Sequence, residues 1–185
     1  VLAADFGFKQ AVATGDRPTI NSALFNHRGR INADLMALVS LNGKNISSVP
    51  KILAPDQTFP YPQVVQNAIS NGGASSLLFI GQRLYQVMML TIDAPTPIAV
   101  AVIGFEINQE WGQQLKNITQ LETTIEVQTK GEETFTISTL PAKLVAPTLA
   151  QQDQPLSWLS LSLFNDVPYV SRRFLLADED NFKVL

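Results

Sequence analysis

Alternation of apolar and polar positions is longest in the middle of the chain, where it predicts three consecutive strands. Leu77 to Ile80 is apolar, Gly81-Gln82 follows it, and Arg83 to Asp93 then continues as a long strand. Glycine at the first turn position adopts a positive φ without steric penalty, which suits a tight hairpin. Ala94-Pro95-Thr96-Pro97 interrupts the pattern because proline cannot donate to a sheet ladder, and Ile98 to Ile107 resumes it. The three segments are therefore predicted to form an antiparallel meander.

The central strand of this meander is apolar at the middle of both of its faces. Successive side chains of a strand point to opposite faces. One face carries Arg83, Tyr85, Val87, Met89, Thr91 and Asp93, and the other carries Leu84, Gln86, Met88, Leu90 and Ile92. We therefore expect both faces to be covered. A covered sheet with polar groups at the ends of one face suits the floor of a small-molecule pocket, and a core sheet without a ligand is the alternative.

Helical periodicity precedes the strands. Apolar residues at helical spacing between Val1 and Thr14 are followed by Gly15, a residue that commonly ends helices. Asp16 is then placed to cap a second helix, with Pro18 in the first turn, where the missing N–H does no harm. The predicted apolar stripe of that helix consists of Ile20, Leu24, His27 and Ile31.

A hairpin and a short helix are predicted between these helices and the meander. Leu35 to Leu41 is predicted as a strand, Asn42-Gly43 as a type I′ turn and Lys44 to Val49 as the partner strand. A loop containing several prolines, Pro50 to Pro62, follows. Gln63 to Ser70 then has the pattern of a short helix.

After Ile107 the chain follows a similar order of elements on a smaller scale. We expect a helix at Gln109 to Ile118, a hairpin formed by Leu121 to Thr129 and Glu133 to Ser138, a short helix at Pro141 to Ala150, and strands at Ser157 to Phe164 and Tyr169 to Leu176. The last segment, Ala177 to Leu185, is predicted as the first turns of an outgoing helix. This order of elements predicts an α+β fold with antiparallel sheets flanked by helices.

Composition narrows the possible functions. The 185 residues are 45% hydrophobic and 16% charged, enough for one large or two small packed domains. The net charge is -3, and the 13 lysines and arginines form no basic run, so we expect no nucleic-acid partner. There are no cysteines, which removes disulfides and thiolate chemistry. The most apolar run, Ile98 to Phe105, is far shorter than the roughly 20 residues of a membrane helix. Because the chain begins at Val1 without a leader pattern, we expect an excised fragment of a longer protein.

Several short motifs resemble the double-Cache extracytoplasmic sensor domains of bacterial signalling proteins. The resemblance covers most of residues 1 to 120 and weakens beyond them. It rests on Asp5-Phe6, the run Ala11 to Asp16, Leu24, Asn26, Arg30 to Asp34, the hairpin Leu35 to Gly43, Phe59-Pro60-Tyr61-Pro62, Tyr85-Gln86-Val87 and Ile103-Gly104-Phe105.

This resemblance implies a domain organisation and a role. Residues 1–30 would be the remnant of a long signalling helix, 31–118 a distal PAS-like module, 119–176 a smaller proximal module, and 177–185 a segment leading towards the membrane. The family implies a periplasmic sensor in a bacterial inner-membrane protein that works as a homodimer, attached through segments outside this chain. The cytoplasmic output would be cyclic-di-GMP synthesis or degradation, or a histidine kinase. No ligand motif of the family maps onto this chain.

Four side chains are candidate ligand-binding residues: Arg83, Tyr85, Asp93 and Tyr61. Arg83 offers a forked donor to a carboxylate, and Tyr85 on the same face offers an aromatic wall with a hydroxyl, which suits a carboxylate or an amino acid. Asp93 lies at the far end of that face. Tyr61 lies in the loop that covers the pocket in PAS-like folds and is a candidate lid residue. In the alternative interpretation, Arg83 lies in solvent beside a turn, Tyr85 packs in the core and Tyr61 is a surface aromatic.

Other polar residues have structural interpretations. Asp34 follows Arg30 by four residues at a helix end, which predicts an ion pair. His27 is expected to be a half-buried stripe residue. The sequence contains no motif of a hydrolase, a phosphate-binding loop or a metal site, so we expect no enzymatic activity in this chain, no metal and no cofactor.

Two other functions remain open at this stage. A module that binds a protein partner would have its pocket filled by Phe79, Met88 and Met89 and an exposed apolar patch elsewhere. A hydrolase would require a solvent-accessible His27 beside a serine or a carboxylate.

Overall fold

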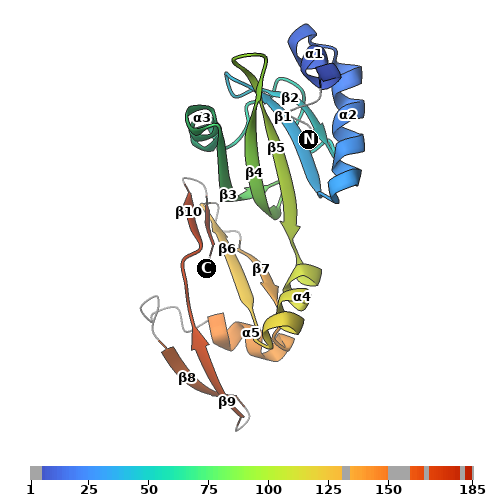
Figure 1. Ribbon diagram of the computed structural model, residues 1–185. Helices are drawn as coiled ribbons and strands as arrows, with labels where there is room; N and C mark the ends of the chain where they lie inside the picture. The colour runs from blue at the N-terminus through green and yellow to red at the C-terminus, as the bar shows by residue number, and fades with distance from the viewer. Residues whose placement is uncertain (1–5, 131–133, 150–158, 165–166, 180–181, 185) are drawn as a thin grey trace. The chain divides into compact units, whose positions relative to one another are not determined.

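The computed structural model describes residues 6–130, 134–149, 159–164, 167–179 and 182–184. The chain divides into two compact units, Val1–Glu106 and Ile107–Leu185, and each unit has its own antiparallel sheet (Figure 1). Helices flank these sheets. The α+β class that the element order predicts is therefore confirmed.

The described residues of the first unit, from Phe6 onwards, form three helices and five strands. They are α1 (Phe6–Thr14), α2 (Arg17–Ile31), β1 (Leu35–Ser40), β2 (Asn45–Val49), α3 (Pro62–Asn71), β3 (Gly73–Ile80), β4 (Arg83–Asp93) and β5 (Pro97–Ile107). The strand order in the sheet is β2-β1-β5-β4-β3, so the predicted meander of β3, β4 and β5 is confirmed. The crossover places β5 beside β1, with Gly104 opposite Leu35.

The two hairpin turns of this sheet differ, and one of them corrects the sequence prediction. Gly81 and Gln82 both have positive φ, as a two-residue type I′ turn requires. In the β1–β2 turn only Gly43 has a positive φ, so the predicted type I′ turn at Asn42-Gly43 is wrong. Residues 41–44 separate the two strands, and the Ser40 hydroxyl donates to Asn42 Oδ1 and to the Lys44 carbonyl within this connection.

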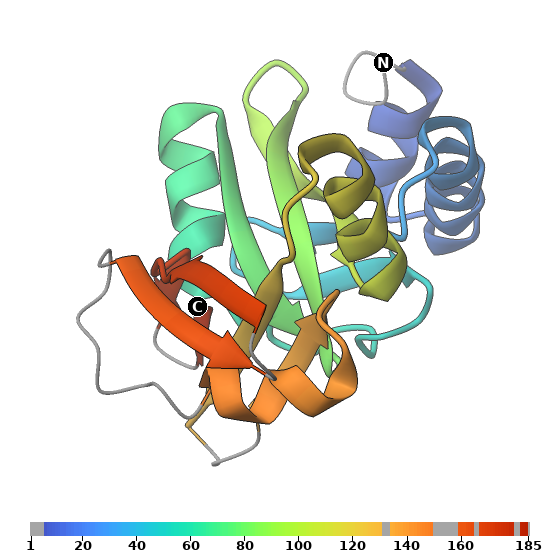
Figure 2. The same ribbon diagram turned by 90° about the horizontal axis from the view of Figure 1, so that it is seen from below.

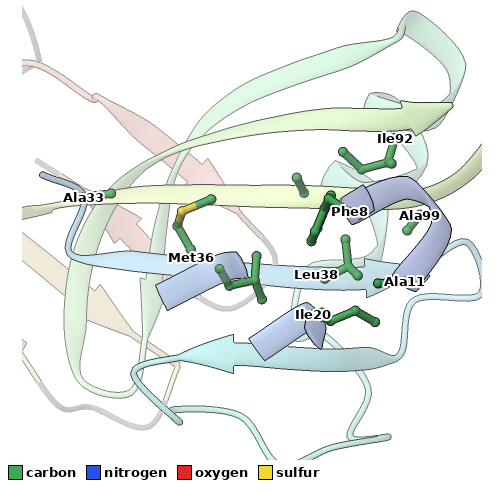
Figure 3. Close-up of a cluster of buried hydrophobic side chains, with 10 residues drawn as sticks. Phe8, Ala11, Ile20, Ala33, Met36, Leu38, Ile92 and Ala99 are labelled. Atoms are coloured by element: carbon green, nitrogen blue, oxygen red, sulfur yellow. The ribbon is translucent and has the colours of Figure 1, made fainter. Parts of the chain in front are cut away.

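Helices α1 and α2 pack on one face of the sheet. Asp16 caps α2 by accepting hydrogen bonds from Thr19, and Gly15 has the positive φ that separates the two helices. Figure 3 shows the resulting core. It contains Phe8, Ala11, Ile20 and Leu24 from the helices and Ala33, Met36, Leu38, Ile92, Ala99 and Ala101 from the sheet and the turn before it.

Helix α3 covers the opposite face, where β4 presents Tyr85, Val87 and Met89, all fully buried. Figure 2 shows α3 and the α1–α2 pair on different sides of the sheet. Gly72, with a positive φ, ends α3. Side chains of α3 itself, Val64, Val65 and Ala68, complete this layer.

One stretch of the α1–α2 face is not covered within the described residues. The helix core reaches β4 only at Ile92, and further along the same face Met88 and Leu90 are 45% and 39% exposed. The expectation that both faces of β4 are covered at the centre is therefore wrong. These side chains are exposed because α2 lies over β1 and β2, near the opposite edge of the sheet, and does not reach this part of β4.

In the parts of the second unit that the structure describes, the elements are α4 (Gln109–Thr119), β6 (Thr124–Thr129), β7 (Thr134–Ser138), α5 (Ala142–Leu149), β8 (Leu159–Phe164), β9 (Val167–Arg172), β10 (Ala177–Glu179) and β11 (Phe182–Val184). The sheet order is β10-β11-β6-β7, and β8 and β9 form a separate hairpin. The outgoing helix predicted for Ala177 to Leu185 is wrong, because Val184 pairs with Val127 in the sheet and both are buried. No helix of the described segments is long and apolar enough to cross a membrane.

Candidate functional site

An ion pair joins the first residue of β4 to the end of β5. Arg83 Nη1 lies 2.9 Å from Glu106 Oε2. The Arg83 side chain is 60% exposed and that of Glu106 19%. The hydrogen bond and charge of Glu106 raise the pKa of Arg83, which is a cation at any physiological pH. The interaction engages one nitrogen of the guanidinium fork, and the Tyr85 hydroxyl also interacts with this group.

Tyr85 lies next to this pair and is buried, with 1% of its surface exposed. Burial is the main cause that raises the pKa of its hydroxyl, and the Glu106 carboxylate raises it further, while Arg83 acts in the opposite direction. The ring packs where residue 104 has no side chain. A Cβ at Gly104 would lie 3.3 Å from Tyr85 Cδ1 and 3.1 Å from Leu35 Cβ. A side chain at this position would therefore require Tyr85 or Leu35 to move by a few tenths of an ångström.

Asp34 connects the end of α2 to the same corner of the sheet. Its backbone N–H donates to the Gly104 carbonyl at 2.9 Å, and its Oδ2 accepts from the Glu106 N–H at 2.7 Å. The predicted ion pair with Arg30 is wrong, because the Asp34 carboxylate is used on the sheet backbone. The nearby arginine contact comes instead from Arg28, whose Nη1 donates to the Asp34 carbonyl at 3.5 Å.

Tyr61 lies near this corner but inside the protein. It is 5% exposed, its hydroxyl donates to the Phe79 carbonyl, and its ring meets that of Phe59 edge-on at 6.2 Å. Phe79 pairs with Leu84 in the sheet, between Arg83 and Tyr85 in sequence. The structure thus brings Tyr61, Tyr85 and Arg83 to one end of the sheet.

The loop before Tyr61 is fixed by buried polar groups. Asn45 Nδ2 donates to the carbonyls of Leu53 and Ala54, and Asn45 is completely buried. Arg17 at the start of α2 holds the loop from outside, with Nη2 at 2.8 Å from both carboxylate oxygens of Asp56. The loop is therefore tied at several points along its length.

Asp93 does not join this group. It ends β4, and a strand rises about 3.3 Å per residue, so it lies roughly 33 Å from Arg83 along the strand. Its carboxylate is exposed and accepts a weak hydrogen bond from Thr91. One small ligand cannot contact both Arg83 and Asp93.

Sequence reasoning missed Glu106 and the role of Asp34. Glu106 is the one charged residue of the third meander strand, Ile98 to Ile107, and that signal was available. The bond from Asp34 to the Glu106 backbone depends on a register that no local pattern reveals. His27 is half-buried on α2, as its place in the apolar stripe predicts. Within the described segments no cluster of three or more histidine, aspartate or glutamate side chains is arranged to hold a metal.

Comparison with known proteins identifies the fold. No protein-family model and no curated protein matches the sequence. Among solved structures, the chain is similar to the sensor domain of the V. cholerae histidine kinase DctB, with a TM-score of 0.58 and 13% sequence identity. The match covers 99% of this chain and 84% of that one. Both units are included in this match, so the chain has the same fold as that domain.

Proposed function

We propose that this chain is the extracytoplasmic ligand-sensing domain of a membrane-bound signalling protein. The observation that carries the proposal is the structural match over 99% of the chain to the sensor domain of a histidine kinase. Such a domain binds and transmits without catalysis of its own. We propose in addition that the domain works as a homodimer, and that the output is either a histidine kinase or an enzyme of cyclic-di-GMP synthesis or degradation.

The proposed ligand is a small carboxylate or amino acid bound at the Arg83 end of the sheet. An exposed guanidinium is the strongest available partner for a carboxylate, and Arg83 is more than half exposed. Tyr85 and Tyr61 would form the wall behind it. Because both rings are buried, contact with the ligand would require a local opening. Asp93 would take part only in a separate contact.

Transmission requires that the ligand bind one arrangement of the domain better than the other. Glu106 is well placed for this. Its side chain pairs with Arg83, its backbone is held by Asp34 from the end of α2, and β5 continues directly towards α4. A change at Arg83 would reach both α2 and the start of the second unit through these bonds.

The alternative is a module that binds a protein partner. Exposed Met88 and Leu90 on β4 favour it, because they form apolar surface beside half-buried Leu77. This alternative expects Phe79, Met88 and Met89 to fill the interior, and only part of that expectation is met. Met89 is buried in the layer under α3, whereas Met88 faces the other way and is exposed.

A thermal-melt screen against carboxylates, amino acids, polyamines, purines and divalent metals tests the proposal. A ligand at 100 times its dissociation constant adds about 2.7 kcal/mol to the free energy of unfolding, which shifts the melting temperature by several degrees. We expect a carboxylate hit that Arg83→Ala abolishes and Tyr85→Phe weakens. A hit that ignores both changes would keep the sensor and reject this site. A panel without any hit would favour the protein-partner alternative.

A further inference from the structure

We propose that Glu106 is a built-in competitor for Arg83: its carboxylate occupies the position on the guanidinium that the carboxylate of the ligand takes, so that binding proceeds by exchange. This inference rests on the proposed sensor function and adds the way in which that site is regulated. It makes Glu106 a residue that sets the affinity of the site without contacting the bound ligand.

The chemistry of the pair fits an exchange. A side-chain carboxylate and a ligand carboxylate present the same two oxygens to a guanidinium, so each can replace the other on Arg83. The observed contact uses one nitrogen of Arg83 and one oxygen of Glu106. The Arg83 side chain is 60% exposed, and an ion pair that water can reach contributes little to stability, so this contact opens at a modest free-energy cost.

The backbone of Glu106 is fixed independently of its side chain. The Glu106 N–H is bound to Asp34 Oδ2, and the Asp34 N–H is bound to the Gly104 carbonyl two residues earlier. Both bonds are made by main-chain atoms of β5. The side chain of Glu106 can therefore leave Arg83 while the strand keeps its position.

The charges around Arg83 favour displacement of the Glu106 carboxylate when a ligand carboxylate arrives. Asp34 already places one carboxylate at the end of β5, and the hydroxyl of Tyr85 interacts with both Glu106 and Arg83. An arriving carboxylate brings a further negative charge to Arg83. Repulsion between it and Glu106 would drive the glutamate side chain outward, since 19% of that side chain is already in contact with solvent.

Glu106→Gln distinguishes competition from direct ligand contact by the sign of its effect. Glutamine keeps the shape of glutamate but binds Arg83 less strongly because it has no charge. If Glu106 competes, this variant binds carboxylates more tightly. If Glu106 instead holds the ammonium group of an amino acid, the variant binds more weakly.

The experiment is isothermal titration calorimetry of the 185-residue chain with the amino acid alanine, which tests the ammonium contact, and with the carboxylate probes acetate, lactate and malonate. We expect Glu106→Gln to lower the dissociation constant of the best of these probes about twofold to fivefold, the range that loss of an ion pair in contact with solvent allows. Arg83→Ala should raise it at least about tenfold, as loss of a charge-assisted contact predicts. The control is Glu110→Gln, because Glu110 is an exposed residue of α4 outside the Arg83–Glu106 ion pair, and loss of its charge should leave the constant unchanged.

Each outcome decides one question. Suppose that Arg83→Ala abolishes the binding seen in wild type, but Glu106→Gln binds no more tightly than wild type. This result overturns the role of Glu106 as a competitor and leaves the ligand site at Arg83 intact. An equal gain in Glu110→Gln also overturns it, because the effect would then come from net charge. Absence of binding by both wild type and Glu106→Gln overturns the proposed site together with this inference. Circular dichroism checks the fold, and Glu106→Ala serves as the second variant if glutamine prevents folding.

Discussion

Two arginine–carboxylate pairs of the first unit have nearly the same contact distance and very different surroundings. Arg17 and Asp56 meet at 2.8 Å, with side chains 49% and 71% exposed, and join a helix start to a loop. Arg83 and Glu106 meet at 2.9 Å beside a buried tyrosine and a bound backbone. The first pair holds a loop. The second lies where a charge on the surface can alter groups in the core.

The difference comes from what lies under each pair. Asp56 belongs to a loop that Asn45 already fixes from inside, so the Arg17 contact adds to an anchored segment. Glu106 belongs to β5, and Gly104, two residues earlier on the same strand, leaves space for the Tyr85 ring. A surface ion pair is worth little by itself. Its coupling to buried groups therefore decides whether it can transmit a signal.

The largest effect is expected from a variant that disturbs the packing beneath the Arg83–Glu106 pair. Gly104→Val places a branched side chain within about 3.3 Å of Tyr85 and Leu35, so it should reduce the free energy of unfolding by about 1–3 kcal/mol. Urea unfolding measures this change. Gly29→Ala on α2 is the matched control, because nothing lies within 4 Å of its new Cβ and it should stabilise slightly. Equal stability of both variants would contradict the packing described for Tyr85.

The second-largest effect is expected from a variant that weakens the loop to which Asp56, the partner of Arg17, belongs. Asn45→Ala removes a buried amide from two loop carbonyls and should destabilise the first unit by about 2 kcal/mol. Carboxylate binding at Arg83 should weaken far less than in Gly104→Val. Ser47→Ala on the same strand is the control, since its hydroxyl bond to Asn21 is exposed. A stronger loss of binding in Asn45→Ala than in Gly104→Val would reverse the comparison.

The smallest effect is electrostatic and concerns Tyr85. Its pKa is raised above the usual value of about 10. The folded state therefore favours the neutral hydroxyl, and this contribution to stability is complete below pH about 10 and is lost as the pH rises through the raised pKa. Phenolate absorbance, with Tyr85→Phe subtracted, measures the titration. Glu106→Gln should lower this pKa and Arg83→Ala should raise it. An unchanged pKa in both variants would place Tyr85 outside the influence of the pair.

Local pattern predicted the elements of the first unit well, because their signals are short-range. Gly81 forms the turn, Asp16 caps α2, and the alternation of β4 separates buried Tyr85 from exposed Gln86. The last segment was wrong for the opposite reason. Alternating Phe182, Lys183 and Val184 become a strand only because β6 offers them an edge more than fifty residues earlier in the chain.

The candidate site was predictable only in part. Arg83 and Tyr85 could be placed on one strand face from their spacing. Glu106 and Asp34 reach them through the pairing of β5 with its neighbours and through a side-chain bond to a backbone N–H spanning 72 positions of sequence. Exposure of Met88 and Leu90 depends on where α2 lies across the sheet, which periodicity does not determine.

The most direct test of the account is a calorimetric titration of the best carboxylate from the screen into Arg83→Ala and Arg17→Ala, side by side. Both variants remove one exposed arginine and one ion pair, so they match in charge and in loss of contact. The account predicts that Arg83→Ala weakens binding at least about tenfold, as expected for a charge-assisted contact, and that Arg17→Ala leaves it unchanged. Equal affinities in the two variants would contradict a ligand site at the Arg83 end of the sheet.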